Sequence, residues 1–451
     1  MKVQTPPNHL EDLGKLNFST DQALISKVFL HGHGGLVDGK YLHWDKLRFL
    51  QPPEGLSHRT WWLGLKLARS QLLRALTLKD SRGLPFQYAM PDPVLQLVHE
   101  IDRDASGRIQ MPEQVTNPTE RDRYLVSSLI EEAITSSQLE GAATTMAVAK
   151  EMLRSGRAPH DRSERMILNN YRAMHFTREF VGKPLTPDLV MKVHEIVTNG
   201  TLDDPSAAGR FRRADEPIVV VDRNENVIHY PPPADELTER LATMCSFANG
   251  TGEKGFLHPV LRAVVLHFWL GYDHPFIDGN GRTARALFYW SMLSTGYWLT
   301  EFISISRILR KAPAKYSRSF VYSETDANDL TYFIIYQLTV IQRAIKELHV
   351  YLERKSAELR TTEKLLRTSQ DLNHRQVALL SHALKHLDFR YTIRSHQRSH
   401  GVVYQTARTD LLGLCARGLL EKRKLGRSLA FYPVGDLVDR IQSKSTNPPK
   451  P

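Results

Sequence analysis

Residues 258–296 constrain the fold of this chain more than any other segment, because they predict two helices joined by a tight glycine turn. Pro259 stands where the first turn of a helix tolerates proline. Apolar residues then recur at helical spacing up to Gly271. A second helical pattern runs from Arg282 and stops at Gly296. The loop between the two helices therefore opens directly onto a helix N-terminus.

The loop, His-Pro-Phe-Ile-Asp-Gly-Asn-Gly over residues 274–281, is suited to binding a phosphate. Backbone N–H groups at the start of a helix have no partner within the helix, so those of residues 279–281 would point at an anion. Arg282 and Arg285 are three residues apart and face the same side of the first turn. The two cations are repelled by the positive end of the helix dipole and by each other. A bound polyphosphate would turn both repulsions into attractions.

Two further side chains in this segment carry chemistry. Asp278 supplies a hard oxygen ligand of the kind that Mg²⁺ takes when water and phosphate supply the others. His274 titrates near neutrality and could accept a proton from an attacking hydroxyl. Each residue alone is also compatible with a capped turn between two core helices. Their combination at this spacing favours a site that handles phosphate.

The segment resembles the motif of the Fic (Fido) family, His-x-Phe-x-(Asp/Glu)-Gly-Asn-Gly-Arg-x-x-Arg, and every fixed position is filled. That family transfers a nucleoside monophosphate, usually AMP from ATP, to a protein side-chain hydroxyl. The resemblance implies a protein adenylyltransferase with ATP as donor substrate and Mg²⁺ as cofactor. It implies that His274 is the catalytic base and that Asp278 binds the metal. The nucleotide would be bound by Asp278, Gly279, Asn280, Gly281, Arg282 and Arg285.

A second candidate motif lies upstream, at residues 135–141, and reads Thr-Ser-Ser-Gln-Leu-Glu-Gly. A serine followed three residues later by a glutamate is the pattern of a capping box. Taken alone, Ser137 with Glu140 therefore predicts the start of a helix over residues 144–153. This interpretation gives the segment a structural role only.

The same stretch resembles the inhibitory motif of the Fic family, (Ser/Thr)-x-x-x-Glu-(Gly/Asn), with Ser136, Glu140 and Gly141 at its fixed positions. The resemblance implies that Glu140 pairs with Arg285 and occupies the place of the γ-phosphate. ATP would then bind with its α-phosphate misaligned, and a displacement of about 1 Å costs on the order of a hundredfold in rate. Whether Glu140 also supports the removal of AMP from a target is left open by this motif.

Residues 218–221 and 227–230 predict a β-hairpin, because two β-rich runs flank a polar turn. A small structural hairpin is one interpretation. In the Fic family this position holds the flap, which pins the target segment over the active site by strand addition. The resemblance implies nucleotide contacts from Val227, Ile228, His229 and Tyr230. Tyr316 either completes the nucleoside pocket or packs in an aromatic core.

Residues 371–435 predict a basic C-terminal domain. The net charge of the chain is +11, and residues 372–434 carry eleven Lys or Arg against three Asp or Glu. Helices over 374–387, 395–400 and 404–417, followed by strands over 419–425 and 428–434, resemble a winged helix-turn-helix. DNA would be contacted by Gln405, Thr406, Arg408, Thr409, Lys422, Arg423, Lys424 and Arg427. The alternative is a winged helix used for protein contact, for instance in a homodimer.

The 451 residues therefore predict a mainly α-helical protein of several domains. We expect a helical Fic core with a β-hairpin flap, followed by an α+β winged helix domain. The boundaries we expect are an N-terminal region of unclear role (1–118), the Fic core with its inhibitory helix (119–340), a helical linker (341–370), the winged helix (371–435) and a disordered tail (436–451).

Composition narrows the class of protein further. No apolar run approaches the roughly 18 residues that span a bilayer, and the N-terminus lacks the apolar segment of a signal peptide. We therefore expect a cytoplasmic protein that does not contact a membrane. Its partner would be a target protein with a Tyr, Thr or Ser hydroxyl, including this chain itself. The alternative is a transcriptional regulator that binds double-stranded DNA and whose Fic core senses nucleotide.

Overall fold

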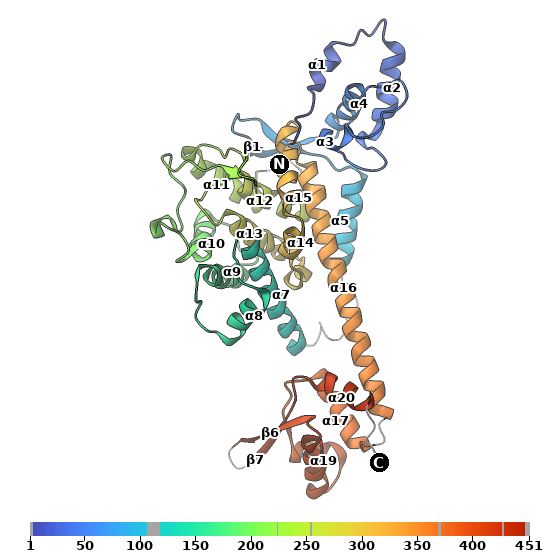
Figure 1. Ribbon diagram of the computed structural model, residues 1–451, viewed down its shortest axis with the longest axis vertical. Helices are drawn as coiled ribbons and strands as arrows, with labels where there is room; N and C mark the ends of the chain where they lie inside the picture. Colours follow the sequence, from blue (N-terminus) through green and yellow to red (C-terminus); the bar gives the residue numbers. More distant parts are fainter. Residues whose placement is uncertain are drawn as a thin grey trace. The chain divides into compact units, whose positions relative to one another are not determined.

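The computed structural model describes residues 3–105, 118–222, 224–252, 255–368, 371–425 and 428–446. The described parts of Met1–Gly107 and Ser127–Lys346 form one compact unit, and those of Arg108–Val126 and Glu347–Pro451 form a second. Both units consist mainly of helices, as predicted (Figure 1). No helix among these residues is long and apolar enough to cross a membrane.

Two consecutive helices, α12 (Pro259–Asp273) and α13 (Asn280–Ser294), form the centre of the first unit. They pack against each other along their length and are buried on nearly all sides. Helix α12 is apolar on nearly all sides, which is typical of a buried helix, whereas α13 also buries Asn280, Arg282 and Arg285. The predicted start at Pro259 is confirmed, and α13 begins two residues earlier than the sequence pattern indicated.

Other helices enclose this central pair. Two of them, α9 (Arg162–Glu179) and α10 (Pro187–Thr198), pack against α13, while α11 (Leu237–Ala248) packs against α12. The remaining elements of this part are α7 (Pro118–Leu139), α8 (Met146–Ser155), η2 (Pro205–Ala207), β3 (Val220–Val221), β4 (Val227–His229), η3 (Ala234–Glu236), η4 (Trp298–Phe302), α14 (Ile305–Lys311), α15 (Pro313–Thr325) and α16 (Thr331–Thr368). Residues 341–368 of the predicted linker lie in the long helix α16, and residues 369–370 lie outside the described residues.

The N-terminal elements belong to the same unit as the central helices. They are α1 (His9–Gly14), α2 (Gln22–Gly32), η1 (His33–Gly35), α3 (Trp44–Leu47), α4 (His58–Ser70), β1 (Arg74–Lys79), β2 (Pro85–Tyr88) and α5 (Asp92–Ala105). A buried ion pair of 2.9 Å joins Lys66 of α4 to Asp326, which follows α15. The Tyr41 hydroxyl donates to Asp329 at 2.5 Å. Because buried charges are costly unless paired, these contacts fix the N-terminal region on the core.

The second unit has its own apolar core. Its elements after α16 are α17 (His374–Lys385), β5 (Tyr391–Thr392), α18 (Ile393–His400), α19 (Tyr404–Ala416), β6 (Leu420–Leu425), β7 (Ser428–Pro433) and α20 (Leu437–Thr446). The three strands form an antiparallel sheet in the order β5-β7-β6. Each helix and strand predicted over residues 374–434 is present within three residues of the expected bounds.

The expectation of a disordered tail from residue 436 is wrong for most of that stretch. The chain forms α20 over Leu437–Thr446, and its Leu437 and Ile441 side chains are buried in the core of the second unit. These two residues lie four apart and so share one helix face. The sequence reasoning gave weight to the polar residues and missed this short apolar stripe. Residues 447–451 lie outside the described part of the chain.

Candidate active site

The loop between α12 and α13 has a tightly defined backbone. His274 follows the last residue of α12 and adopts the left-handed conformation, with φ of 43°. Gly279 has φ of 84°, and its carbonyl accepts the first helical hydrogen bond of α13, from Thr283 at 2.9 Å. A Cβ on Gly279 would lie 2.7 Å from Thr198 Cγ2. Only glycine therefore fits the turn that starts α13.

Asn280 braces this loop with its side chain. Its Oδ1 accepts from the backbone N–H of Phe276 at 3.0 Å, and its Nδ2 donates to the Phe276 carbonyl at 2.8 Å. The side chain is buried and both of its polar ends are used. The predicted phosphate contact of Asn280 can therefore come only from its backbone N–H, not from its amide side chain.

The imidazole of His274 has a defined tautomer. Nδ1 lies 3.3 Å from the Gly271 carbonyl, which can only accept, so Nδ1 carries the proton. Burial lowers the pKa of His274 to about 4, and the nearby His229 and Arg212 act in the same direction. The ring is therefore neutral at pH 7, with the lone pair on Nε2. This is the form that a general base requires.

Arg282 is fully buried, with its guanidinium behind the loop. Its Nη1 donates to the Val197 carbonyl at 3.1 Å, and its Nη2 lies 3.3 Å from Asp278 Oδ1. Asp278 Oδ1 also accepts from the backbone N–H of Gly279 at 2.5 Å. The carboxylate is 40% exposed and its Oδ2 lies 4.0 Å from Arg162. One carboxylate oxygen therefore holds the loop while the other is accessible.

Arg285 is held by the end of α7. Its Nε donates to Ser136 Oγ at 2.8 Å, and its Nη2 donates to the Ser136 carbonyl at 3.2 Å and to Glu140 Oε1 at 2.8 Å. The predicted ion pair between Glu140 and Arg285 is confirmed. Within the described residues, Arg282 Nε and Arg285 Nη1 are buried donors without a hydrogen-bond partner. Such orphan donors are rare and are suited to a bound anion.

The capping-box interpretation of this segment is wrong. Ser136 and Ser137 lie inside α7, where Ser137 Oγ donates to the carbonyls of Ala133 and Met166. The next helix, α8, is capped by Thr145 instead. Gly141 follows the end of α7 with φ of 97° and allows the chain to turn sharply after Glu140.

The predicted hairpin is present but shorter than expected. β3 and β4 are antiparallel, with Val220 opposite His229, and Asp222 caps the turn between them. The side chains of Val227 and Tyr230 are 42% and 71% exposed, whereas Ile228 is half-buried. His229 is buried, and its ring contacts Glu324 Oε2 at 2.7 Å and the Tyr272 carbonyl at 2.6 Å. Both nitrogens of His229 are therefore engaged by the protein.

Tyr316 takes part in the aromatic packing that was one of its two predicted roles. Its hydroxyl lies 2.8 Å from His267 Nε2, and its ring lies near those of His267, Phe320 and Tyr336. Burial raises the pKa of Tyr316 far above its usual value, with smaller effects from Arg285 and Glu140. The hydroxyl group is therefore close enough to Arg285 to interact with it electrostatically.

Sequence reasoning assigned no role to two residues that hold this site. His194 of α10 accepts from the Gly209 N–H at Nδ1 and donates through Nε2 to the Asp278 carbonyl at 2.9 Å, and it stacks on Phe276. Arg212 donates through Nε to the His274 carbonyl at 2.9 Å. His194 lies in no recognisable motif. Arg212 ends the Gly-Arg-Phe-Arg stretch over residues 209–212, which resembles the usual lead-in to the flap in the Fic family.

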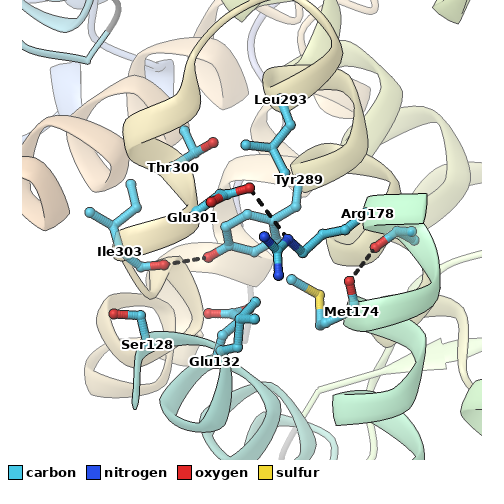
Figure 2. Close-up of a pocket in the computed structure, with 11 residues that line it drawn as sticks. Ser128, Glu132, Met174, Arg178, Tyr289, Leu293, Thr300, Glu301 and Ile303 are labelled. Carbon is cyan, nitrogen blue, oxygen red and sulfur yellow. Dashed lines mark hydrogen bonds and ion pairs between the residues drawn. The ribbon is translucent and has the colours of Figure 1, made fainter. Parts of the chain in front are cut away.

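A small cavity lies beside α7 rather than at the loop between α12 and α13. It measures about 10 Å³, which is room for about one water, and it lies between α7, α9, α13 and η4. Figure 2 shows Glu132, Arg178 and Tyr289 around it, with the Tyr289 hydroxyl donating to the Ile303 carbonyl at 3.2 Å. This cavity is too small to hold a nucleotide.

Most of the residues predicted to contact DNA are exposed. Gln405, Arg408 and Thr409 on α19 and Lys422, Arg423 and Lys424 on β6 are exposed, and Thr406 is half-buried. Arg423 lies over the Tyr432 ring at 5.0 Å and 3.2 Å from Glu421. Arg427, the remaining residue predicted to contact DNA, lies outside the described residues.

The fold and this site define a helical protein in which a neutral histidine lies beside the N-terminus of the buried helix α13. Residues 184–292 match the sequence model of the Fic/DOC family. Residues 184–292 therefore form a Fic/DOC family domain within this chain.

Curated proteins named protein adenylyltransferase Fic are similar to part of this chain. The protein adenylyltransferase Fic of Nematostella vectensis is 25% identical over 233 residues, which is 50% of this chain and 52% of that protein. The protein of the same name from Drosophila grimshawi is 30% identical over 164 residues, 35% of this chain and 32% of that protein. The match spans about half or less of the length of these relatives.

One solved structure has the same fold over most of its length. It is a Fic family protein from Desulfovibrio desulfuricans G20, with a TM-score of 0.51 and 20% sequence identity. The match covers 77% of this chain and 98% of that one. At this level of identity the likeness concerns the fold alone.

Proposed function

We propose that this protein is an adenylyltransferase that moves AMP from ATP onto a hydroxyl group of a protein side chain. The observation that carries the proposal is the pair of orphan donors, Arg282 Nε and Arg285 Nη1, buried at a glycine loop beside the neutral His274. Cationic donors and helix N–H groups stabilise phosphate oxygens in phosphoryl-type transfer. The names of the curated relatives support the same reaction.

The reaction assigns a task to each group. The target hydroxyl oxygen attacks the α-phosphorus of ATP, and the bond from that phosphorus to the β-phosphate oxygen breaks, so pyrophosphate leaves. Nε2 of His274 takes the hydroxyl proton, since its lone pair is free when Nδ1 donates to Gly271. The negative charge of a bound triphosphate would raise the pKa of His274 from about 4, which makes it a stronger base.

The phosphates would lie between the N-terminus of α13 and the two arginines. The backbone N–H groups of Gly279, Asn280 and Gly281, with Arg282, would bind the inner phosphates, and Arg285 the γ-phosphate. Asp278 fits as the ligand of Mg²⁺, because its carboxylate is 40% exposed and its ion pair with Arg282 is made through Oδ1. When bound, Mg²⁺ neutralises charge on the phosphates.

The hairpin would act as the flap that receives the target. Val221 and Val227 are half exposed, and β3 and β4 pair with no other strand among the described residues. A target segment could therefore add as a further strand beside them. Ile228 and Tyr230 are the flap side chains left to touch the nucleotide, since both ring nitrogens of His229 are occupied.

Glu140 would inhibit the reaction by occupying the γ-phosphate site. Its carboxylate pairs with Arg285 and also lies against Gly281, where a Cβ would meet Glu140 Oε1 at 2.1 Å. A γ-phosphate held by Arg285 needs the same space. With Glu140 in place, ATP would bind in a displaced position that does not align for attack.

Intact-mass spectrometry of the purified Glu140→Gly protein after incubation with ATP and Mg²⁺ tests the proposal. We expect one or more AMP additions to the variant, few to the wild type and none to a Glu140→Gly/His274→Ala control. Because the control removes only the base, it separates catalysed transfer from chemical labelling. The absence of an adduct in Glu140→Gly, both alone and with added cell proteins, would contradict the proposal.

The second unit favours DNA binding as an additional function. The observation in support is the exposed set Arg408, Lys422, Arg423 and Lys424, placed on a helix and an adjacent strand of a small antiparallel sheet. The order of elements supports a winged helix, in which α19 would enter the major groove and β6 would form the wing. Cations at these positions would neutralise DNA phosphates.

Salt-dependent binding to double-stranded DNA tests this second function. We expect the affinity of the full chain to fall linearly with salt on logarithmic axes, with a slope of about 0.9 per phosphate contact. Replacing Lys422, Arg423 and Lys424 by alanine should lower that slope, whereas His274→Ala should leave it unchanged. A DNA affinity that changes neither with salt nor with the triple substitution would assign the surface to a protein partner instead.

A further inference from the structure

The C-terminal end of α12 is closed by residues from the flap region. Five consecutive carbonyls, those of residues 271–275, accept hydrogen bonds that lie outside the regular helix pattern. Their donors in chain order are His274 Nδ1 (3.3 Å), His229 Nε2 (2.6 Å), Arg212 Nη2 (3.5 Å), Arg212 Nε (2.9 Å) and the Arg212 backbone N–H (2.9 Å). Carbonyls at a helix end have no partner inside the helix, so these donors complete the cap.

Arg212 supplies most of this cap. Its side chain is buried, and its planar guanidinium bonds the carbonyls of Asp273 and His274 from one side. The same Nη2 also donates to the Pro232 carbonyl, which lies just after the flap strand β4. A cation at the negative end of a helix dipole is favourable as well. Arg212 therefore ties the flap exit to the backbone of the catalytic histidine.

His229 makes the second connection. It is the last residue of β4, it is buried, and its Nε2 donates to the Tyr272 carbonyl. On its other side, Nδ1 lies 2.7 Å from Glu324 Oε2 on α15. Glu324 thereby fixes the plane of the imidazole, as a carboxylate does for a histidine in many sites. The flap strand is bonded to α12 two residues before His274.

His274 depends on such support because its backbone is strained. A residue with a side chain rarely adopts φ of 43°, and it stays there only when its surroundings hold it. Of the five capped carbonyls, one belongs to His274 itself and three others belong to residues 272, 273 and 275. The orientation of Nε2 toward an incoming hydroxyl therefore rests on the cap.

We propose that Arg212 and His229 are positioning residues that set the catalytic histidine through the carbonyls of α12, and that they couple the flap to that histidine. This inference rests on the proposed adenylyltransferase function. Neither residue needs to touch ATP or the target hydroxyl. Their loss should thus slow the chemical step more than it weakens ATP binding.

Variants in the Glu140→Gly background test the role of Arg212. Arg212→Lys keeps the charge but loses the planar fork, and a displacement of the base by about 1 Å would slow transfer on the order of a hundredfold. We expect the ATP concentration at half-maximal rate to stay within about twofold, since the phosphate contacts are unchanged. The neighbouring Arg213 is exposed, so Arg213→Lys is the matched control and should leave the rate unchanged.

Two replacements of His229 separate positioning from packing. The amide of His229→Gln can still donate to the Tyr272 carbonyl, whereas His229→Leu cannot. We expect the glutamine variant to recover most of the transfer rate that the leucine variant loses. Equal rates in both, or loss of ATP binding in parallel with rate, would overturn the assignment and leave a purely structural role.

The ring ¹⁵N signals of His274 provide a readout that needs no activity. In the Glu140→Gly parent we expect a protonated Nδ1 and a free Nε2, assigned by comparison with His274→Gln. Arg212→Gln should shift or broaden that pattern, and Arg213→Gln should not. If the parent transfers no AMP, the proposed function fails, while an unchanged His274 pattern in Arg212→Gln would overturn the positioning role by itself.

Discussion

Glu140 Oε1 lies 2.8 Å from Arg285 Nη2, at the point where an anion bound to the start of α13 would lie. The Glu140 side chain is 30% exposed and Arg285 is 1% exposed, so a buried cation is neutralised by a carboxylate that solvent can reach. Such a pair can be displaced from the exposed side by a competing anion. The ion pair is therefore suited to regulating the site, because either Glu140 or a bound anion can pair with Arg285, and it does not serve stability alone.

Arg285 should be required for transfer even when Glu140 is absent. In Glu140→Gly the guanidinium is free to bind the γ-phosphate, so adding Arg285→Lys replaces a two-pronged contact by a point charge. We expect the transfer rate to fall by about tenfold or more relative to Glu140→Gly, together with weaker ATP binding, in a quantitative mass assay at several ATP concentrations. An undiminished rate in the double variant would remove Arg285 from the mechanism.

Ser136 should contribute to inhibition, and Ser137 should not. Ser136 Oγ accepts from Arg285 Nε at 2.8 Å, and a hydrogen bond to a charged group contributes about 1.5–3 kcal/mol. We expect Ser136→Ala to loosen Arg285 and raise transfer several-fold in the same mass assay, though less than Glu140→Gly does.

Ser137→Ala is the matched control for this comparison. Ser137 Oγ donates only to the carbonyls of Ala133 and Met166 in the hydrogen bonds observed, and it does not contact Arg285. Transfer by Ser137→Ala should stay at the wild-type level. Equal activation by both substitutions would point to general loosening of α7 rather than to the Arg285 contact.

The local parts of this site could be predicted from the sequence, because each depends on residues close together in the chain. The loop over 274–281 carries its own turn chemistry. The pairing of Glu140 with Arg285, which are 145 residues apart, was instead implied by the resemblance to the inhibitory motif of the Fic family. The hairpin and the helices of the second unit were predicted from periodicity and turn residues. These patterns need no knowledge of the tertiary structure.

The supporting contacts could not be predicted, because they join residues far apart in sequence. Arg212 meets His274 across 62 residues, and His229 meets Glu324 across 95. A buried arginine or histidine has no periodic signature, and its role is set by which carbonyls or carboxylates the fold brings to it. The capping-box interpretation of Ser137 failed for the same reason, since burial of α7 by the core extended the helix through that residue.

The pH dependence of transfer should reflect the lowered pKa of His274. Burial holds that pKa at about 4 in the free enzyme. The His274 ring is therefore still in its neutral, basic form well below pH 6.5. The quantity kcat/KM for ATP reports the free enzyme, and its acidic limb should fall as the pH drops through about 4. Between about pH 5.5 and 7.5 the titration of His274 should therefore cause no change in kcat/KM.

Glu140 raises the pKa of His274, so the acidic limb should not move to higher pH in Glu140→Gly. The measurement is the initial rate of AMP transfer at low ATP in Glu140→Gly across this range. A limb centred near pH 6.5 would show that His274 is hydrated like an ordinary surface histidine, and it would contradict the buried geometry.

Folding stability should fall on mild acidification, because three other histidines are buried in the neutral form. Burial lowers the pKa of His43 and His194 to about 4 and that of His267 to about 3, from 6.5. Below pH 6.5 the unfolded chain binds protons that the folded chain excludes, so the stability that is complete above pH 6.5 is lost progressively toward pH 4. Each group contributes a slope of up to about 1.4 kcal/mol per pH unit.

Urea unfolding of the full chain at several pH values between 7.5 and 5 measures this slope. We expect the midpoint to fall steadily as the pH is lowered. His267→Gln keeps a donor for the Tyr316 hydroxyl contact but cannot titrate. The change of its unfolding free energy with pH should therefore be smaller than that of the wild type, by the contribution of about one bound proton. A wild-type midpoint that is constant or rises on acidification would mean that these rings are protonated, and so paired or hydrated, inside the folded protein.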